Sequence, residues 1–229
     1  DDTLVEKIGQ QSDEQADGLS IRELERIRDE NLVGILQSLK GSHGGKGWGA
    51  GKLLKDFEQH LWAAGGGKKE TPDVTRPLRL IDTKVSPAWV DYNGHMTEHR
   101  YLQVFGDTSD ALLRLIGVDL DYVERGHSYY TVETHIRHLG EAKLGQAIHS
   151  TAQILASDEK RLHVFHALHD TASGDLIATA EQMLLHVDAK AGKAVAASEE
   201  VLAKLRPIAA AHAVFAMPEG AGRHVGQKR

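Results

Sequence analysis

The sequence has no cysteine among its 229 residues, which excludes disulfide bonds and metal sites built from thiolates. It also has no apolar run near the roughly 18 residues of a membrane span. The formal net charge is −6 and no long basic tract is present, so nucleic acid is not an expected partner. Aromatic residues make up only 5%, but hydrophobic residues make up 41%, which is enough for a core. These absences leave a globular protein of one large domain or two small ones.

The beginning of the chain lacks the pattern of a secretory signal peptide. Asp1, Asp2 and Thr3 stand where a signal peptide carries a basic and then an apolar segment. The first residue is not Met, which suggests a fragment or a processed product. The simplest interpretation is a soluble cytoplasmic protein.

Residues 1–64 show helical patterns. In the strongest of them, over 21–40, apolar residues recur at a spacing of about 3.6 residues. Ser20 and Glu23 form the Ser-x-x-Glu pattern of a capping box at its start. We therefore expect a small all-helical segment in this part of the chain. Two weaker helical patterns cover 3–17 and 52–64.

Glycine is concentrated in two stretches of the first third. The stretch 41–51 follows no strand and fits neither the G-x-G-x-x-G nor the P-loop spacing, so we interpret it as a connector between helices. The second stretch begins with Gly65-Gly66-Gly67 and stays polar as far as Pro77. We expect a linker over 65–77, with a domain boundary there.

From Leu78 the pattern changes to one strand, one long helix and then a run of strands. An antiparallel sheet can wrap around such a helix and bury its apolar stripe. The arrangement predicts an α+β domain of the hotdog fold over 78–190. The expected strands cover 78–85, 129–139, 146–156, 161–169 and 176–187, and the long helix covers about 95–116.

The last part of the chain, 191–229, is expected to hold one helix and a flexible tail. The helix covers about 198–212, with Ser198 as its cap and a break at Pro207. The tail begins near Met217.

The first strand and the long helix are joined by the segment Asp91-Tyr92-Asn93-Gly94-His95-Met96, which concentrates groups able to do chemistry. Gly94 permits a tight turn and a close backbone approach. The first N–H groups of a helix have no intrahelical partner, and the helix dipole adds positive charge there. Such an end can stabilise negative charge that develops on an oxygen.

This segment, with Tyr101 five residues after it, resembles the active site of acyl-CoA thioesterases of the 4-hydroxybenzoyl-CoA thioesterase type. The resemblance covers about residues 77–190. It implies that Asp91 is the nucleophile or general base and that the backbone N–H groups of Gly94, His95 and Met96 polarise the thioester carbonyl. It also implies an acyl-CoA substrate and a homodimer or homotetramer formed through the sheet.

Residues 1–62 resemble the end of the helical C-terminal domain of L-carnitine dehydrogenase. The matching segments are Leu19–Val33 and Gly47-Trp48-Gly49-Ala50-Gly51. The nucleotide-binding half of that family is absent from this chain, so no nicotinamide or other cofactor is expected. The two segments occur in the order found in some bacterial L-carnitine dehydrogenases, which are fused to a C-terminal hotdog thioesterase assigned to betainyl-CoA. The chain therefore resembles the C-terminal part of such a fusion.

A betainyl group is a quaternary ammonium without a hydrogen to donate, so aromatic faces are the expected recognition elements. Trp89 and Tyr92 flank Asp91 in sequence, and Tyr101 lies on the long helix. Strand alternation sends Tyr129 and Tyr130 to opposite faces, so one of them at most can line the pocket. Core packing is the alternative use of these rings. A further candidate, the carboxylate of Glu133, could approach the site from another subunit.

Several residues of the segment have a second interpretation. Asp91 could be only a turn or capping residue. Asn93 could orient Asp91 or make an Asx turn, and His95 could brace Asp91 or act as the main base.

Other functions fit the same residues less well. His95-Met96-Thr97-Glu98-His99 matches the H-x-x-E-H metal motif, but the helix starts at a hotdog hinge, so no metal is expected. The spacing of Asp91 and His95 and the missing proline argue against a hotdog hydratase. His163, His166 and His169 are interpreted as surface strand residues. A non-catalytic acyl-CoA-binding or assembly module remains an alternative.

Overall fold

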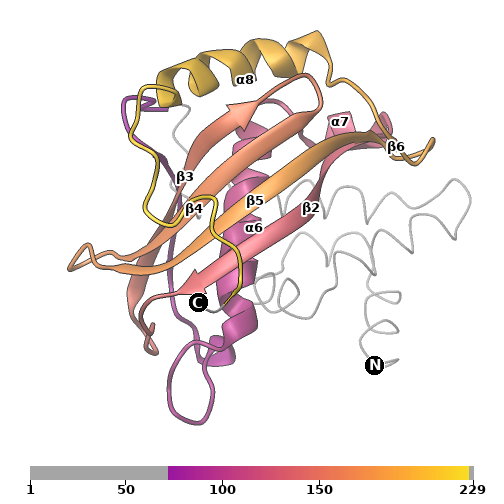
Figure 1. Cartoon of the computed structure of the whole chain (residues 1–229). Coiled ribbons are helices and arrows are strands. Elements are labelled where there is room, and N and C mark those ends of the chain that lie inside the picture. Colours follow the sequence, from indigo (N-terminus) through magenta and orange to yellow (C-terminus); the bar gives the residue numbers. More distant parts are fainter. Residues whose placement is uncertain (1–71, 227–229) are drawn as a thin grey trace, which may run out of the picture. The chain divides into compact units, whose positions relative to one another are not determined.

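The computed structural model describes residues 72–226. The chain divides into two units, Asp1–Lys69 and Glu70–Arg229. The helices predicted over 3–17, 21–40 and 52–64, and most of the predicted linker, lie outside the described residues. The described elements, shown in Figure 1, are β1 Leu78–Lys84, η1 Pro87–Trp89, α6 Glu98–Leu115, α7 Leu120–Glu124, β2 His127–His138, β3 Ala147–Ser157, β4 Arg161–Asp170, β5 Leu176–Asp188, β6 Lys193–Ala194 and α8 Glu199–His212.

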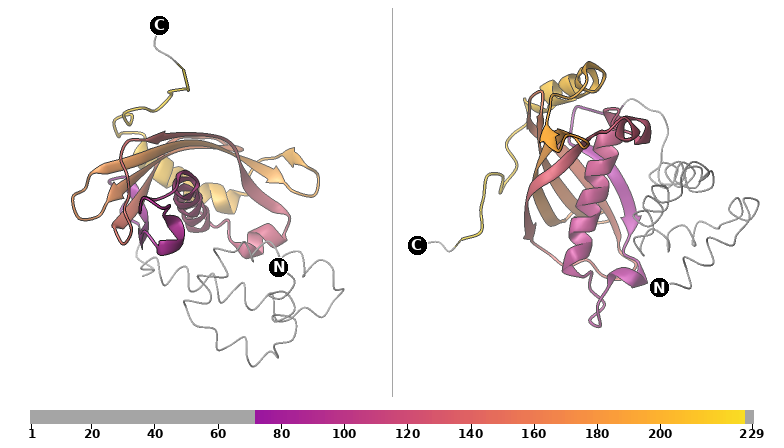
Figure 2. Two further views of the ribbon diagram at one scale, coloured as in Figure 1. Left: turned by 90° about the horizontal axis from the view of Figure 1, so that it is seen from below. Right: turned by 90° about the vertical axis from the view of Figure 1, so that its right-hand side faces the viewer.

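One antiparallel sheet with the strand order β1-β3-β4-β5-β2 forms the domain, and the short β6 pairs with β5. The sheet curves around α6, which lies along its inner face (Figure 2). The prediction of an α+β hotdog domain, with a long helix between the first two long strands, is therefore confirmed. Three short elements, η1, α7 and β6, were not predicted.

The apolar stripe of α6 explains why the sheet closes around this helix. Tyr101, Val104, Phe105, Leu112 and Leu113 are buried at spacings of three and four residues or their multiples, so they share one face. They pack against alternate residues of the inner sheet face. Burial of each large side chain contributes about 1.5–3 kcal/mol, which makes this contact a main source of stability.

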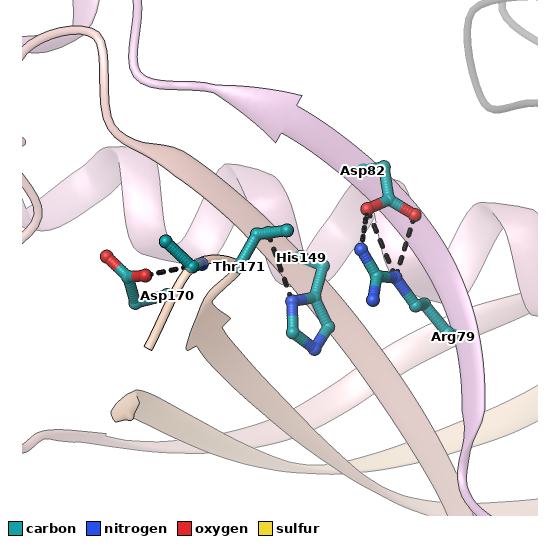
Figure 3. A network of polar contacts seen from close by, with 6 residues as sticks. Arg79, Asp82, His149, Asp170 and Thr171 are labelled. Atoms are coloured by element: carbon teal, nitrogen blue, oxygen red, sulfur yellow. Dashed lines mark hydrogen bonds and ion pairs between the residues drawn. The ribbon is translucent and has the colours of Figure 1, made fainter. Parts of the chain in front are cut away.

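Strand alternation decides which histidines are buried. His166 of β4 faces α6 and is fully buried, so the interpretation of this residue as a surface histidine is wrong. His163 and His169 are half-buried on the opposite face. On the same outer face, His149 of β3 hydrogen-bonds through Nδ1 to the hydroxyl of Thr171 (3.1 Å; Figure 3).

The helix α8 packs at the C-terminal end of α6. Its residues Val201, Leu202, Leu205 and Ile208 share one buried cluster with Ile116. The predicted cap is confirmed, because the side chain of Ser198 accepts a hydrogen bond from the Val201 N–H (3.4 Å).

The predicted break at Pro207 is wrong, since α8 runs without interruption from Glu199 to His212. Proline deprives the carbonyl four residues earlier of its donor. Both Pro207 and Ala203 are exposed, so water can solvate that carbonyl and the helix continues.

The helix α6 begins later than predicted. It starts at Glu98 rather than near His95, with Thr97 as N-cap. The N–H of Met96 donates to the carbonyl of Ala142 (2.8 Å), and Met96 also bridges to Val90. Because these residues pair across a short hairpin, they are not part of the helix.

Residues 216–222, most of them in the predicted flexible tail, cross the outer face of the sheet (Figure 1), and the chain then leads away from it toward its C-terminal end (Figure 2). Gln153 of β3 donates to the carbonyl of Ala216 (3.2 Å), and Arg137 of β2 donates to that of Glu219 (3.0 Å). The N–H of Gly222 donates to the carboxylate of Glu181 on β5 (2.7 Å). The tail therefore makes contacts with three strands. Among the described helices, none is long and apolar enough to cross a membrane.

Candidate active site

The segment between β1 and α6 forms a tight turn at Asp91–His95. The N–H of Asp91 donates to the carbonyl of His95 (3.0 Å), and the N–H of Gly94 donates to the carbonyl of Asp91 (3.0 Å). Gly94 has φ +77°, a left-handed conformation that glycine adopts without steric cost. A side chain at this position would be strained even though it would meet no neighbouring atom within 4 Å.

The carboxylate of Asp91 is held by its own turn. Its Oδ1 accepts hydrogen bonds from the N–H groups of Asn93 (2.8 Å) and His95 (3.4 Å), and Asn93 Nδ2 lies 3.4 Å from Oδ2. The hydrogen bond from the Asn93 backbone is the main cause that lowers the pKa of Asp91. The turn interpretation and the catalytic interpretation are thus compatible, because the Asx turn keeps a charged carboxylate at a fixed position.

A second carboxylate lies on the other side of His95. The Nε2 atom of His95 is 3.5 Å from Oε2 of Glu141, which belongs to the loop between β2 and β3. The positive charge that His95 carries when protonated also favours the ionised form of Asp91. The sequence analysis did not identify Glu141. This residue lies in a loop 50 positions after Asp91, and no local pattern relates the two before the fold is known.

The open N–H groups of α6 lie beyond the residues predicted to provide them. The N–H groups of Gly94 and Met96 are already bonded to carbonyl oxygens within the domain. Glu98 and His99 supply the first helical N–H groups, which by helix geometry lack intrahelical partners. The Thr97 side chain does not cap them, because its hydroxyl donates to the carbonyl of Trp89 (3.2 Å).

The predicted aromatic residues do not meet in one pocket within a single chain. Trp89 is 3% exposed and belongs to the core, whereas Tyr92 is 96% exposed. Tyr101 is 4% exposed, and its hydroxyl accepts a hydrogen bond from Ala142 N–H. Both rings are therefore buried within a single chain, and neither offers an open face to solvent.

The tyrosines of β2 follow the predicted alternation. Tyr129 is buried and Tyr130 is 52% exposed. Glu133 is exposed on the same strand, and it lies five residues from His138, whose ring contacts Tyr101 edge-on at 4.8 Å. Five strand residues span about 16 Å, so Glu133 is far from this end of the strand.

The H-x-x-E-H motif does not form on one helix. His95 lies in the turn before α6, and His99 lies within α6. Within residues 72–226 there is no group of three or more side chains placed to hold a metal ion.

A curved antiparallel sheet around a central helix is the hotdog fold, and the turn of Asp91 lies just before the start of that helix. Residues 85–205 match the family model of the Thioesterase-like superfamily. The chain belongs to this superfamily.

Curated relatives match either the whole chain or about two thirds of it. One from Rhizobium meliloti, named L-carnitine dehydrogenase/betainyl-CoA thioesterase, is 73% identical over the whole chain, and the chain spans 46% of its length. A Pseudomonas aeruginosa relative named betainyl-CoA thioesterase is 42% identical over 67% of this chain and 97% of its own. The chain thus covers about half of the longer relative and nearly all of the shorter one.

Solved structures agree with the fold. A protein from Pseudomonas putida described as a thioesterase has 36% identity and a TM-score of 0.59, covering 67% of this chain and 99% of its own. A Staphylococcus aureus protein solved in complex with CoA has 25% identity and a TM-score of 0.61, covering 65% of this chain and 94% of its own.

Proposed function

We propose that this chain hydrolyses betainyl-CoA to betaine and CoA, with Asp91 as the group that attacks the thioester or activates water. The carboxylate of Asp91 on a rigid turn beside the start of α6 is the observation that carries the proposal. The names of the relatives supply the acyl group, and the CoA complex of the Staphylococcus aureus protein supports a CoA thioester as substrate.

Two routes lead from this geometry to hydrolysis. As a nucleophile, an Asp91 oxygen attacks the carbonyl carbon, the C–S bond breaks and CoA leaves as the thiolate. Water then cleaves the mixed anhydride and regenerates Asp91. As a general base, Asp91 takes a proton from the water that attacks the carbonyl carbon; the C–S bond then breaks, and the leaving CoA thiolate takes up the proton from Asp91. In both routes the N–H groups of Glu98 and His99 face the carbonyl oxygen and stabilise its negative charge.

The electrostatics of Asp91 suit both routes. Hydrogen bonds from its own turn lower its pKa, so the carboxylate is charged at neutral pH. The nucleophilic route needs a charged oxygen that attacks the carbonyl carbon, and the general-base route needs a charged oxygen that takes a proton from water.

We propose a homodimer, or a homotetramer built from it, through the outer edge of β2. In the described part of the chain no strand pairs with this edge, and it carries the exposed side chains of Tyr130 and Val132. The opposite edge strand, β1, instead presents the charged pair Arg79 and Asp82 (Figure 3), which discourages strand pairing. A second copy on β2 would bring its own Tyr130 and Glu133 to the interface.

This assembly also suggests how a cationic acyl group is recognised. Tyr92 and Tyr130 have exposed rings, and an aromatic face over a quaternary ammonium contributes about 0.5–2 kcal/mol. Glu133 adds a negative charge on the same strand as Tyr130. We therefore propose that these aromatic rings surround the quaternary ammonium only in the assembled protein, and not within one chain.

A hydrolysis assay with matched substrates tests the proposal. Betainyl-CoA is compared with tert-butylacetyl-CoA, in which carbon replaces the charged nitrogen at equal size, and with acetyl-CoA. We expect release of CoA with a preference for the cationic substrate. Hydrolysis without that preference would contradict betainyl-CoA as the substrate. Binding without hydrolysis of any thioester would favour the acyl-CoA-binding module.

A further inference from the structure

The hydroxyl of Tyr101 makes a contact that its predicted role in substrate binding does not explain. Tyr101 lies on α6, one turn after the start of the helix, and is 4% exposed. Its hydroxyl oxygen accepts a hydrogen bond from the N–H of Ala142 (3.2 Å), which is itself completely buried. Removal of the hydroxyl would leave a buried N–H without its acceptor, which is energetically unfavourable.

Ala142 connects Tyr101 to the turn of Asp91. The carbonyl of Ala142 accepts the N–H of Met96 (2.8 Å), and the N–H of Leu144 donates to the carbonyl of Gly94 (3.1 Å). His95 and Lys143 form the bridge between these two bonds. The loop segment 142–144 therefore pairs as a short antiparallel strand with the second half of the turn.

The other end of this loop is held independently of α6. The N–H of Gly145 donates to the carbonyl of Val85 (2.8 Å), and the N–H of Val85 donates to the carbonyl of Gln146 (2.9 Å). These bonds fix the loop to the chain just after β1. The bond from Ala142 to Tyr101 fixes it to α6, the element that supplies the open N–H groups.

We infer that Tyr101 is a positioning residue that holds the loop Gly140–Gln146 against α6, so that this loop keeps the Asp91 turn in register with the first N–H groups of the helix. The inference rests on the proposed catalytic role of Asp91. A displacement of about 1 Å between a reacting group and its substrate can cost on the order of 100-fold in rate. Tyr101 thus acts through Ala142 and Met96 and does not touch the substrate.

The chain offers a control at a second buried tyrosine. Tyr122, on α7, is 2% exposed; its hydroxyl accepts a hydrogen bond from the N–H of Ser198 (3.2 Å) and also lies 2.8 Å from Nε2 of His186. Tyr122→Phe therefore also deprives a backbone N–H of a tyrosine acceptor, and it removes the contact with His186 as well, but away from the Asp91 turn. A purely structural role of Tyr101 would give Tyr101→Phe the result expected of Tyr122→Phe, a lower stability with an unchanged kcat.

The experiment compares Tyr101→Phe and Tyr122→Phe in the full chain by steady-state kinetics and thermal unfolding. Both variants should unfold at lower temperature than the wild type. Only Tyr101→Phe should lower kcat, by about tenfold, with KM changed by less than about twofold, because positioning is expressed at the reacting centre. An unchanged kcat for Tyr101→Phe, or equal losses in both variants, would overturn the inference.

Amide hydrogen exchange gives a readout that needs no catalysis. Tyr101→Phe should speed exchange at Met96 and Leu144 by about tenfold, and Tyr122→Phe should leave both amides unchanged. If the wild type hydrolyses no thioester, the proposed function fails and exchange alone decides whether Tyr101 holds the turn. Unchanged exchange at Met96 and Leu144 in Tyr101→Phe would overturn the inference in either case.

Discussion

The two ends of α6 differ in burial and in how the neighbouring helix ends are capped. At the C-terminal end, Ile116 is fully buried beneath α8, and both following helices have side-chain caps, Asp119 for α7 and Ser198 for α8. At the N-terminal end, Thr97 does not cap the helix, and the preceding turn exposes a carboxylate. Open donors beside a charged group are unfavourable for stability but useful for binding a carbonyl that becomes negative. The comparison separates an end that stabilises the fold from the end for which we propose the chemistry.

The variant Asp91→Asn tests the proposed chemical role of the N-terminal end most directly. We expect kcat to fall by about 100-fold or more, because the charge and most of the basicity are lost while the shape remains. Folding should change little, since an amide oxygen can still accept the N–H of Asn93. Acyl-CoA hydrolysis and thermal unfolding measure both effects.

The control for that variant is Asp119→Asn. The Oδ1 atom of Asp119 accepts the N–H of Tyr122 (3.0 Å) in the same way, but at the opposite end of α6. It should keep wild-type kcat. Near-normal hydrolysis by a folded Asp91→Asn variant would end the proposed mechanism.

Shortening a buried side chain at the C-terminal end of α6 should lower stability and leave kcat unchanged, the reverse of Asp91→Asn. Leu205 of α8 is 1% exposed in the cluster with Ile116. Leu205→Ala should lower the free energy of unfolding by about 2–5 kcal/mol, through lost burial and a cavity, with kcat unchanged at temperatures where the variant is folded. Denaturant unfolding measures this loss, and the exposed Arg206→Ala on the same helix is its control. A large drop in kcat of the folded Leu205→Ala variant would show that the two ends are coupled.

Mild acid should weaken the interior while Asp91 stays charged. Burial lowers the pKa of His166 to about 4, whereas in the unfolded chain it takes up a proton near its usual pKa of 6.5. Stability from this residue is therefore complete above pH 6.5 and is lost as pH falls toward 4. Between pH 7 and pH 5 the loss is on the order of 2 kcal/mol.

Unfolding midpoints at several pH values measure this loss, and His166→Gln should flatten their pH dependence. Because the pKa of Asp91 is lowered, the folded enzyme should keep its carboxylate ionised over the same range. A midpoint that does not change between pH 7 and pH 5 would contradict the role of His166.

The smallest effect is expected from removal of residues 1–67. Asp91, the loop Gly140–Gln146 and every strand among the described residues lie beyond this segment. A chain that starts near Thr71 should hydrolyse acyl-CoA like the full chain, and neither form should bind a nicotinamide cofactor. Kinetics and equilibrium binding check both statements. Loss of activity in a folded, correctly assembled truncation would contradict the division into two modules.

Much of the fold could be predicted because its signals are local. The spacing of Val104, Phe105 and Leu112 predicts the buried face of α6, and alternation predicts opposite faces for Tyr129 and Tyr130. Further along β2 a register shift between Thr131 and Glu133 reverses that alternation. The misplaced start of α6 results from competition between local and tertiary bonds. Residues 95–97 could have extended the helix, but Met96 instead pairs with Ala142, which is 46 positions away.

The sequence by itself determined the hotdog fold class, the cap at Ser198 and Asp91 as the candidate catalytic group, because each follows from periodicity or from residues a few positions apart. Only the tertiary structure decided where the open N–H groups lie, that Glu141 stands beside His95, and that Trp89 is buried. It also decided that Tyr101 is buried and that its hydroxyl accepts a hydrogen bond from the N–H of Ala142. These features depend on which distant segments meet when the sheet closes around α6, and no local pattern records the atoms that a backbone N–H or a ring will meet there.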